Sequence, residues 1–411
     1  MILTPCPGVL PNEVTSYTPT DGLEKLAQQL IPRVAPKFEQ VHVWSYANTT
    51  ENPEFPGVTH VHPGEATTAG MQALQQAVGE CGITHLLLIG DSNLMNIVSS
   101  AELIYDRAER PVIYAWCCLP NPFVNHNDLR VANYFDFLVF TSDLERGAFS
   151  DGIAGLGPQV TKHAFTTTLN ARTIRPGVDT SVFRPMETGR REFGREEIRG
   201  ELFSHAVGGG DFLITVCGRN HCFSGVAQVM AMVDRLRDMV DRPVRLYLHM
   251  PQQGYENLLA LAEGNELVLN TDIFIGDTFF GQQGQPMATS SQMNMIYNAS
   301  SLVLSMEQRG LWPTHLLEAQ AAAVATAGPE DHVWLDALYN KGLTLPTVLG
   351  SVNGDYRRVC DPIGAAQIIA EKLKDQEAWE TLRERGISYA HSSEASWDRA
   401  ATQWLRLFGL D

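Results

Sequence analysis

Long apolar runs and basic residues are both scarce in this sequence. Its 411 residues contain no stretch of about 18 apolar side chains, the length that a membrane-spanning helix requires. No lysine or arginine occurs between Lys37 and Arg107, and the formal net charge is −17. Nucleic-acid-binding proteins usually present a basic surface, because contacts to phosphate groups dominate their affinity. The charge therefore argues against DNA or an anionic membrane as the main partner, although a local arginine patch is compatible with it.

Paired cysteines and targeting signals are also missing. The seven cysteines show no spacing that fits a zinc site or a disulfide framework (positions 6, 81, 117, 118, 217, 222 and 360). Most lie in or beside apolar segments, where a reduced cysteine behaves as a small hydrophobic residue. The N-terminus lacks a basic region followed by an apolar one, so we expect no signal peptide. These absences favour a cytoplasmic location.

The composition is that of an ordinary globular protein, with 44% hydrophobic and 19% charged residues. A chain of 411 residues is long enough for two or three domains, each with its own core. No Gly-x-Gly-x-x-Gly motif is present, so the sequence lacks a dinucleotide fingerprint.

Short apolar segments alternate with amphipathic ones in the first half of the chain. The apolar segments are typical of buried strands, and the amphipathic segments between them predict helices. Strands separated by helices imply right-handed crossovers and a parallel sheet, so we predict a Rossmann-like α/β domain over residues 1–178. The expected strands are 2–4, 41–45, 58–62, 85–89, 112–116 and 137–140, and the expected helices include 23–34, 67–81 and 94–107.

Three positions in this half are candidates for a ligand-binding edge. Gly8 lies in the loop after the first strand, where an open α/β sheet binds its ligands. Asp91 ends another strand, and the alternative role for it is a helix N-cap. His126 lies in the loop after the strand 112–116, and the alternative there is an ordinary surface histidine.

The segment Ile174–Pro185, with the sequence Ile-Arg-Pro-Gly-Val-Asp-Thr-Ser-Val-Phe-Arg-Pro, separates the first series of elements from a second. Pro176 and Gly177 are typical of a turn. Val178 and Phe183 are apolar anchors on an otherwise polar segment. We interpret this segment as a tethered interdomain linker, with an ordinary loop as the alternative.

A glycine-flanked turn follows the expected strand 212–217. Its sequence is Gly218-Arg219-Asn220-His221-Cys222-Phe223-Ser224-Gly225, and a helix comes next. A strand, a glycine turn and a helix N-terminus together present backbone N–H groups to an anion. Arg219 adds a guanidinium that can grip two phosphate oxygens. The segment is therefore a candidate phosphate site, and a purely structural turn is the alternative.

A second informative segment, residues 305–319, follows the expected strand 302–305. Pro313 suits the first turn of a helix, which the apolar residues after it continue. Glu318 then lies about one turn into this helix, beside an alanine-rich run. A buried carboxylate needs a partner, and a ribose diol is a suitable one. A capping or salt-bridging role is the alternative.

Together these segments resemble the retaining GT-B glycosyltransferases, the family of sucrose- and glycogen-synthase-like enzymes. Residues 174–185 are similar to the family's interdomain segment "NGVD…F.P", 218–225 to "GR….KG", 293–305 to "l..lY..ad.fv.pS" and 305–319 to "EGfGlp.lEAmA". The resemblance implies two Rossmann-like domains that face each other across a cleft. The implied parts are an acceptor domain (1–178), a linker (179–185), a donor domain (186–390) and a C-terminal helix (391–411) that returns to the first domain.

The resemblance also implies roles for the turn after residue 217. Gly218, Arg219 and Gly225 match family residues that bind the donor's diphosphate. The family lysine falls on Ser224, so one of two usual positive charges is missing. The family often has a histidine where Cys117 falls, and His126 is a possible substitute for it.

Two family glutamates lie eight positions apart, and this sequence keeps one of them. Glu318 matches the glutamate that holds the ribose. The other falls on Gly310, which cannot replace it. Either a longer loop lets Glu307 reach the donor sugar, or that contact is lost.

The activity implied by the resemblance is transfer of a hexosyl or related sugar, with retention, from a nucleotide-diphosphate sugar. The resemblance implies UDP as the nucleotide, although the residues themselves do not identify the base. No Asp-x-Asp motif is suitably placed, in agreement with the family's metal-independent pattern, so no metal or other cofactor is expected. Arg219 and the N–H groups of the turn would stabilise the leaving diphosphate.

Two alternatives remain at the sequence level. One is a GT-B enzyme that glycosylates hydroxymethylated bases in phage DNA. The other is a non-catalytic nucleotide or glycan binder, which the departures at Ser224, Gly310 and Cys117 would allow. The acceptor is otherwise a glycan or a small molecule, and the sequence does not indicate an oligomeric state.

Overall fold

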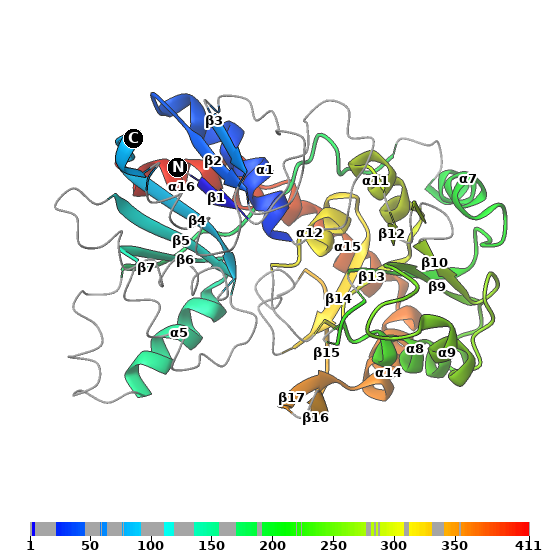
Figure 1. The fold of residues 1–411 in the computed structure, drawn as a ribbon. Coiled ribbons are helices and arrows are strands. Elements are labelled where there is room, and N and C mark those ends of the chain that lie inside the picture. Colours follow the sequence, from blue (N-terminus) through cyan, green and yellow to red (C-terminus); the bar gives the residue numbers. More distant parts are fainter. Residues whose placement is uncertain are drawn as a thin grey trace.

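The computed structural model describes residues 2–4, 22–45, 58, 60–63, 76, 78–91, 111–118, 135–155, 170–186, 191–218, 220–222, 224–276, 281–282, 285–286, 288–307, 312–330, 341–352 and 355–410. Two parallel sheets, each with its own helices, form the two sides of the molecule in Figure 1. This arrangement confirms the expected α/β fold with two Rossmann-like domains.

The first sheet has seven parallel strands in the order β3-β2-β1-β4-β5-β6-β7. The six expected strands are all present. The seventh, β7, was not predicted from the sequence, because its polar residues carry no apolar signal. The strands are β1 (Ile2–Thr4), β2 (His42–Ser45), β3 (His60–Pro63), β4 (His85–Asp91), β5 (Val112–Cys118), β6 (Phe137–Phe140) and β7 (Asn170–Thr173).

Within the described part of the first domain, three helices accompany this sheet: α1 (Gly22–Val34), α5 (Asp143–Gly155) and the C-terminal α16 (Trp397–Leu407). Helix α1 and helix α16 pack together, and Leu30, Trp116 and Trp404 lie in their shared core. The chain therefore ends on its first domain, as expected. Of the predicted helix 67–81, the residues that the structure describes include a helical end at 78–80, and the predicted helix 94–107 lies outside the described residues.

The second sheet has six parallel strands in the order β10-β9-β8-β13-β14-β15. Its helices cover both faces, so the domain is doubly wound. One core packs against α8 (Val226–Arg237) and α14 (Pro362–Lys374). Another packs against α7 (Arg191–Phe203), α11 (Ser290–Ala299) and α12 (Thr314–Ala321). The strands are β8 (Phe212–Cys217), β9 (Val244–His249), β10 (Ile273–Ile275), β13 (Leu302–Leu304), β14 (Ala325–Pro329) and β15 (Leu343–Leu345).

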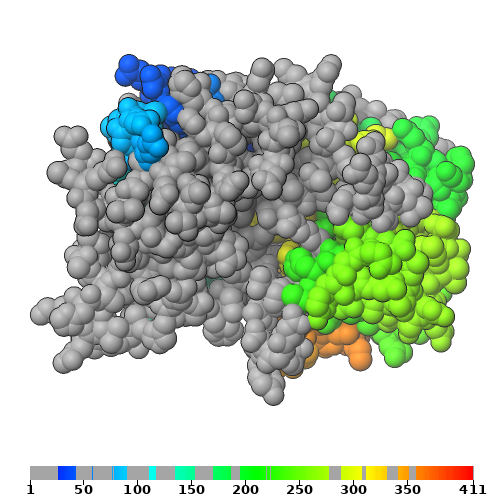
Figure 2. Space-filling view, viewed as in Figure 1, coloured from blue at the N-terminus to red at the C-terminus, as the bar shows by residue number. Residues whose placement is uncertain are grey.

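The other elements of the second half complete this domain. Its helices are α7 (Arg191–Phe203), α8 (Val226–Arg237), α9 (Leu258–Gly264), α11 (Ser290–Ala299), α12 (Thr314–Ala321), α14 (Pro362–Lys374) and α15 (Gln376–Ala390). Two hairpins are β11–β12 (Gly281–Gln282, Gln285–Pro286) and β16–β17 (Thr347–Val352, Asp355–Cys360). Figure 2 shows residues between about 200 and 275, in green, over a large part of the right-hand surface. In the described ranges, no helix has the length and apolar character needed to cross a membrane.

A buried arginine anchors the charged helix α7. Arg199 donates hydrogen bonds to the carbonyl oxygens of Ala299 (2.8 Å), Gly208 (2.6 Å) and Asp211 (3.0 Å). Burial is the main cause that lowers the pKa of Arg199, to about 9. The sequence pattern of a charged surface helix gave no sign of this internal contact.

The linker and the C-terminal segment cross between the domains side by side. The Val178 N–H donates to the Ala395 carbonyl at 2.8 Å, and Val178 forms a parallel bridge with Ser396. A Cβ on Gly177 would lie 2.8 Å from Trp397 Cα, so the two backbones touch at a glycine. This pairing positions the C-terminal helix on the first domain.

Candidate functional site

The second sheet changes winding direction between β8 and β13. These strands are parallel neighbours, with Ile214 opposite Leu302 and Thr215 opposite Val303. The chain moves outward through β9 and β10 on one side and through β14 and β15 on the other. Ligands of open α/β sheets bind beyond the carboxyl ends of the strands at such a switch point. The loops after β8 and β13 are the two segments that the sequence singled out, so the structure brings them together.

A close backbone contact joins these loops. Gly225 has φ +65°, and a Cβ at this position would lie 2.8 Å from the Met306 carbonyl carbon. Glycine adopts a positive φ without strain and leaves room for the second backbone. Gly225 also caps α8, because its carbonyl accepts from the Val229 N–H at 3.0 Å. The sequence pattern placed Gly225 in the turn but did not reveal its contact with the other loop.

An imidazole and a carboxylate face each other across the same junction. His221 Nε2 lies 3.1 Å from Glu307 Oε1, and their side chains are 33% and 22% exposed. The Ser224 N–H donates to the His221 carbonyl at 3.0 Å, which closes the turn before α8. The sequence analysis quoted His221 but gave it no role. Its place in the middle of the glycine turn was the signal that could have identified it.

Asn220 holds this turn against the segment after β9. Its amide nitrogen donates to the carbonyls of Pro251 (3.2 Å) and Glu256 (2.7 Å), and its amide oxygen accepts from the Glu256 N–H (3.0 Å). Gly218 begins the turn, and its N–H donates to the His249 carbonyl at 3.3 Å. Of the other candidates here, Ser224 is buried, whereas Arg219 and Gly310 lie outside the described residues.

Glu318 lies in α12 and is 5% exposed. Its carboxylate accepts a 2.8 Å hydrogen bond from the hydroxyl group of the fully buried Tyr297 on α11. An ionised carboxylate has about four acceptor sites, so this bond is compatible with further contacts. The sequence analysis used Tyr297 only as part of a fold motif and did not identify it as the partner of Glu318.

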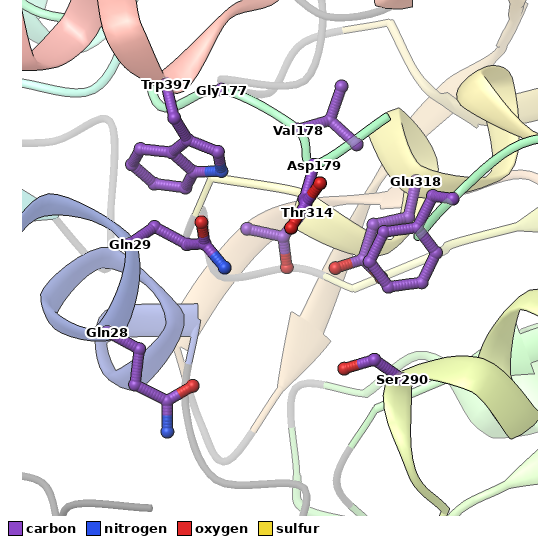
Figure 3. Close-up of a pocket in the computed structure, with 10 residues that line it drawn as sticks. Gln28, Gln29, Gly177, Val178, Asp179, Ser290, Thr314, Glu318 and Trp397 are labelled. Atoms are coloured by element: carbon purple, nitrogen blue, oxygen red, sulfur yellow. The ribbon is translucent and has the colours of Figure 1, made fainter. Parts of the chain in front are cut away.

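A cleft between the two domains contains Glu318. Figure 3 shows Gln28, Gln29 and Trp397 on one side, with Ser290 and Glu318 on the other. The sequence did not identify the two glutamines, because nothing in an amphipathic helix indicates which face meets a second domain. The cleft is lined by Gln28, Gln29, Gly177, Val178, Asp179, Phe183, Ser290, Thr314, Glu318 and Trp397.

The first sheet has its own switch point between β1 and β4. Asp91 ends β4 and lies opposite Cys118, the last residue of β5. Cys117 precedes Cys118, so Asp91 and Cys117 both lie at the carboxyl edge of adjacent strands. Strand β5 extends beyond its expected end at residue 116 and includes Cys117. Gly8 and His126 lie outside the described residues. Among the side chains that are described, no three His, Cys, Asp or Glu gather as metal ligands.

Two facing Rossmann-like domains with a returning C-terminal helix define the GT-B fold of glycosyltransferases. The fold resembles sucrose-phosphate synthase from Thermosynechococcus elongatus, with a TM-score of 0.69 and 13% sequence identity. The match covers 99% of this chain and 97% of that chain.

Two further solved structures share the fold. One is the α,α-trehalose 6-phosphate synthase from Burkholderia multivorans, with a TM-score of 0.65, 13% identity and coverage of 99% and 98%. The other is WaaG, a glycosyltransferase of lipopolysaccharide biosynthesis, with a TM-score of 0.63, 14% identity and 100% coverage of both chains. No protein-family model and no curated protein sequence matches this chain. At these identities the similarity shows the fold.

Proposed function

We propose that this protein is a retaining glycosyltransferase that moves a hexosyl or related sugar from a nucleotide-diphosphate sugar to an acceptor. One observation carries the proposal. In a GT-B fold, the glycine turn after β8 and the glutamate loop after β13 meet at the switch point, with Gly225 packed against Met306. This is the position at which an open α/β sheet binds a ligand.

The nucleoside half of the donor is assigned to the interdomain cleft. Glu318 accepts hydrogen bonds from the ribose diol, while the Tyr297 hydroxyl keeps its carboxylate in place. Thr314 and Ser290 line the same cleft. The diphosphate is assigned to the glycine turn, which begins at Gly218 and ends with Ser224 and Gly225 at the start of α8.

Arg219 and Glu307 are assigned to the reacting part of the donor. The bond between the anomeric carbon and the diphosphate oxygen breaks, and its electron pair stays on that oxygen. The acceptor hydroxyl forms the new bond from the same face, and its proton passes to the departing phosphate. Arg219 and the N–H groups of the turn stabilise the charge on the diphosphate. Glu307 accepts from a hydroxyl of the donor sugar, and Gly310 belongs to its loop. No metal and no protein base enters these steps.

The acceptor side is assigned to the first domain, near Asp91 and Cys117, with Gly8 and His126 in the neighbouring loops of the sequence. The net charge of −17 favours a glycan or a small molecule over DNA as the acceptor. We place the enzyme in the cytoplasm, in keeping with its unpaired cysteine pattern.

The experiment has two stages. A thermal-shift screen with UDP-, GDP- and ADP-sugars identifies the donor, because a ligand that binds the native state raises the unfolding temperature. The purified protein is then incubated with that donor, and slow hydrolysis or transfer is followed by NMR. We expect a product with the donor's anomeric configuration, at a rate that EDTA leaves unchanged.

The variant Arg219→Ala tests the assigned contact between Arg219 and the diphosphate. It should weaken binding of the nucleoside diphosphate by about 1.5–3 kcal/mol, the range for a hydrogen bond to a charged group, while the free nucleoside binds as before. Inversion of the anomer would contradict the retaining mechanism. Binding of nucleotides without turnover of any donor would favour the non-catalytic binder.

A further inference from the structure

A leaving diphosphate requires positive charge, and besides Arg219, which is already assigned to this site, the described residues at the junction of the two loops supply little of it. Of the described residues at this junction (218, 220–222, 224–225 and 305–307), one side chain can carry a positive charge, His221. Ser224 is neutral, and Glu307 adds a negative charge. The whole chain has a formal charge of −17, so the background potential does not favour an anion.

The position of the His221 ring is fixed from two sides. The hydrogen bond from the Ser224 N–H to the His221 carbonyl holds its backbone, and Glu307 Oε1 lies 3.1 Å from Nε2. Gly225 and Met306 keep the two loops in contact directly beside this pair. A ring held in this way contributes its charge without reorganisation, which is the condition for effective electrostatic stabilisation.

We infer that His221 is a further residue of the donor site and that its imidazole stabilises the diphosphate. The inference rests on the proposed function. Glu307 is a positioning residue for this ring: its Oε1 orients the imidazole, and we assign its Oε2 to the sugar.

The test measures binding by calorimetry at pH 5.5. The probes are UDP, GDP, ADP and inorganic pyrophosphate, with uridine, guanosine and adenosine as ligands without phosphate. His221→Gln should weaken binding of the cognate diphosphate and of pyrophosphate by about ten- to a hundredfold, as for loss of a charged hydrogen bond. Binding of the nucleoside should be unchanged, because it has no phosphate.

Two further variants isolate the phosphate contact. His221→Lys should still bind pyrophosphate tightly, because lysine carries a positive charge. His205→Gln is the matched control, since His205 is an exposed histidine in the turn after α7, before β8 begins. It should bind every probe as the wild type does.

The outcomes separate this inference from the proposed function. If the wild type binds a nucleoside diphosphate and His221→Gln binds it equally well at pH 5.5, His221 has no role in the site. An equal loss of affinity for nucleosides and diphosphates would make its role structural and overturn the inference. If the wild type binds none of the diphosphates, the proposed function fails as well.

Discussion

Gly225 lies directly against the backbone of Met306, and a Cβ added at Gly225 would stand 2.8 Å from the Met306 carbonyl carbon. Gly225→Ala should therefore separate the two loops of the donor site. The positive φ of Gly225 adds about 1–3 kcal/mol of backbone strain for any other residue. We expect a lower free energy of unfolding and weaker diphosphate binding, measured by urea denaturation and calorimetry.

Gly210→Ala is the control for this change. Gly210 precedes β8 at the opposite end of the strand, and a Cβ there would meet no atom within 4 Å. This variant should keep the wild-type stability within about 0.5 kcal/mol, the usual range for surface changes. If both glycine variants lose the same stability, the contact with Met306 has no special importance.

The pair of Tyr297 and Glu318 gives a second prediction. Tyr297→Phe removes a buried donor, which should lower the free energy of unfolding by about 1–3 kcal/mol. Glu318→Gln keeps the shape of the side chain but removes its charge. If Glu318 holds the ribose, this variant should weaken binding of the nucleoside and of its diphosphate by the same factor, as calorimetry can measure.

The comparison with His221 makes this prediction specific. His221→Gln should affect only ligands with phosphate, whereas Glu318→Gln should affect every ligand with a ribose. Pyrophosphate, which has no ribose, should bind Glu318→Gln as it binds the wild type. A selective loss of pyrophosphate binding in Glu318→Gln would place this glutamate at the diphosphate instead.

Alanine substitutions at two glycines, one in the linker and one in the first domain, should change the free energy of unfolding in opposite directions. Gly177→Ala places a Cβ 2.8 Å from Trp397 Cα, so it should destabilise the crossing by about 1–3 kcal/mol through overpacking. Gly147 lies within helix α5, and a Cβ added there would meet no atom within 4 Å. Alanine should stabilise that helix by about 0.5–1 kcal/mol. Equal shifts in the unfolding temperature of the two variants would refute the role of the crossing.

Tyr114 predicts a pH dependence of stability at alkaline pH. Burial, together with the nearby Asp136, raises the pKa of Tyr114 from 10.0 to about 12. The folded state therefore favours the neutral phenol, and this contribution is complete below pH 10 and is lost as the pH rises toward 12. The phenol also donates to the Leu407 carbonyl of α16 at 3.4 Å.

Urea denaturation between pH 8 and 11.5 measures this effect. The stability difference between the wild type and Tyr114→Phe should shrink as the pH increases, because only the wild type has to lose this proton. Tyr255→Phe is the control, since the Tyr255 side chain is exposed. A difference for Tyr114→Phe that is constant with pH would show that the phenol keeps its proton throughout.

Much of the fold followed from local sequence patterns. The segment Phe212–Cys217 was predicted with the same ends that the structure shows, because a short apolar run between polar turns has few other interpretations. The strands β7 and β14 escaped prediction. Asn170–Thr173 is polar at the edge of its sheet, and Ala325–Pro329 is made of small residues that give no strand signal.

The positions of many strands along the chain, the glycine turn and the position of Glu318 in a helix were therefore determined by the sequence. The tertiary structure decided which of these local features meet. His221 contacts Glu307 across 86 residues, and Tyr297 contacts Glu318 across 21. Hydrophobic periodicity and turn-forming residues report on a few neighbouring residues, so they do not reveal contacts between residues that far apart in the sequence. These contacts exist because β8 and β13 became neighbours at the switch point of one sheet, and because the linker and the C-terminal segment bring α1 to the cleft that contains Glu318.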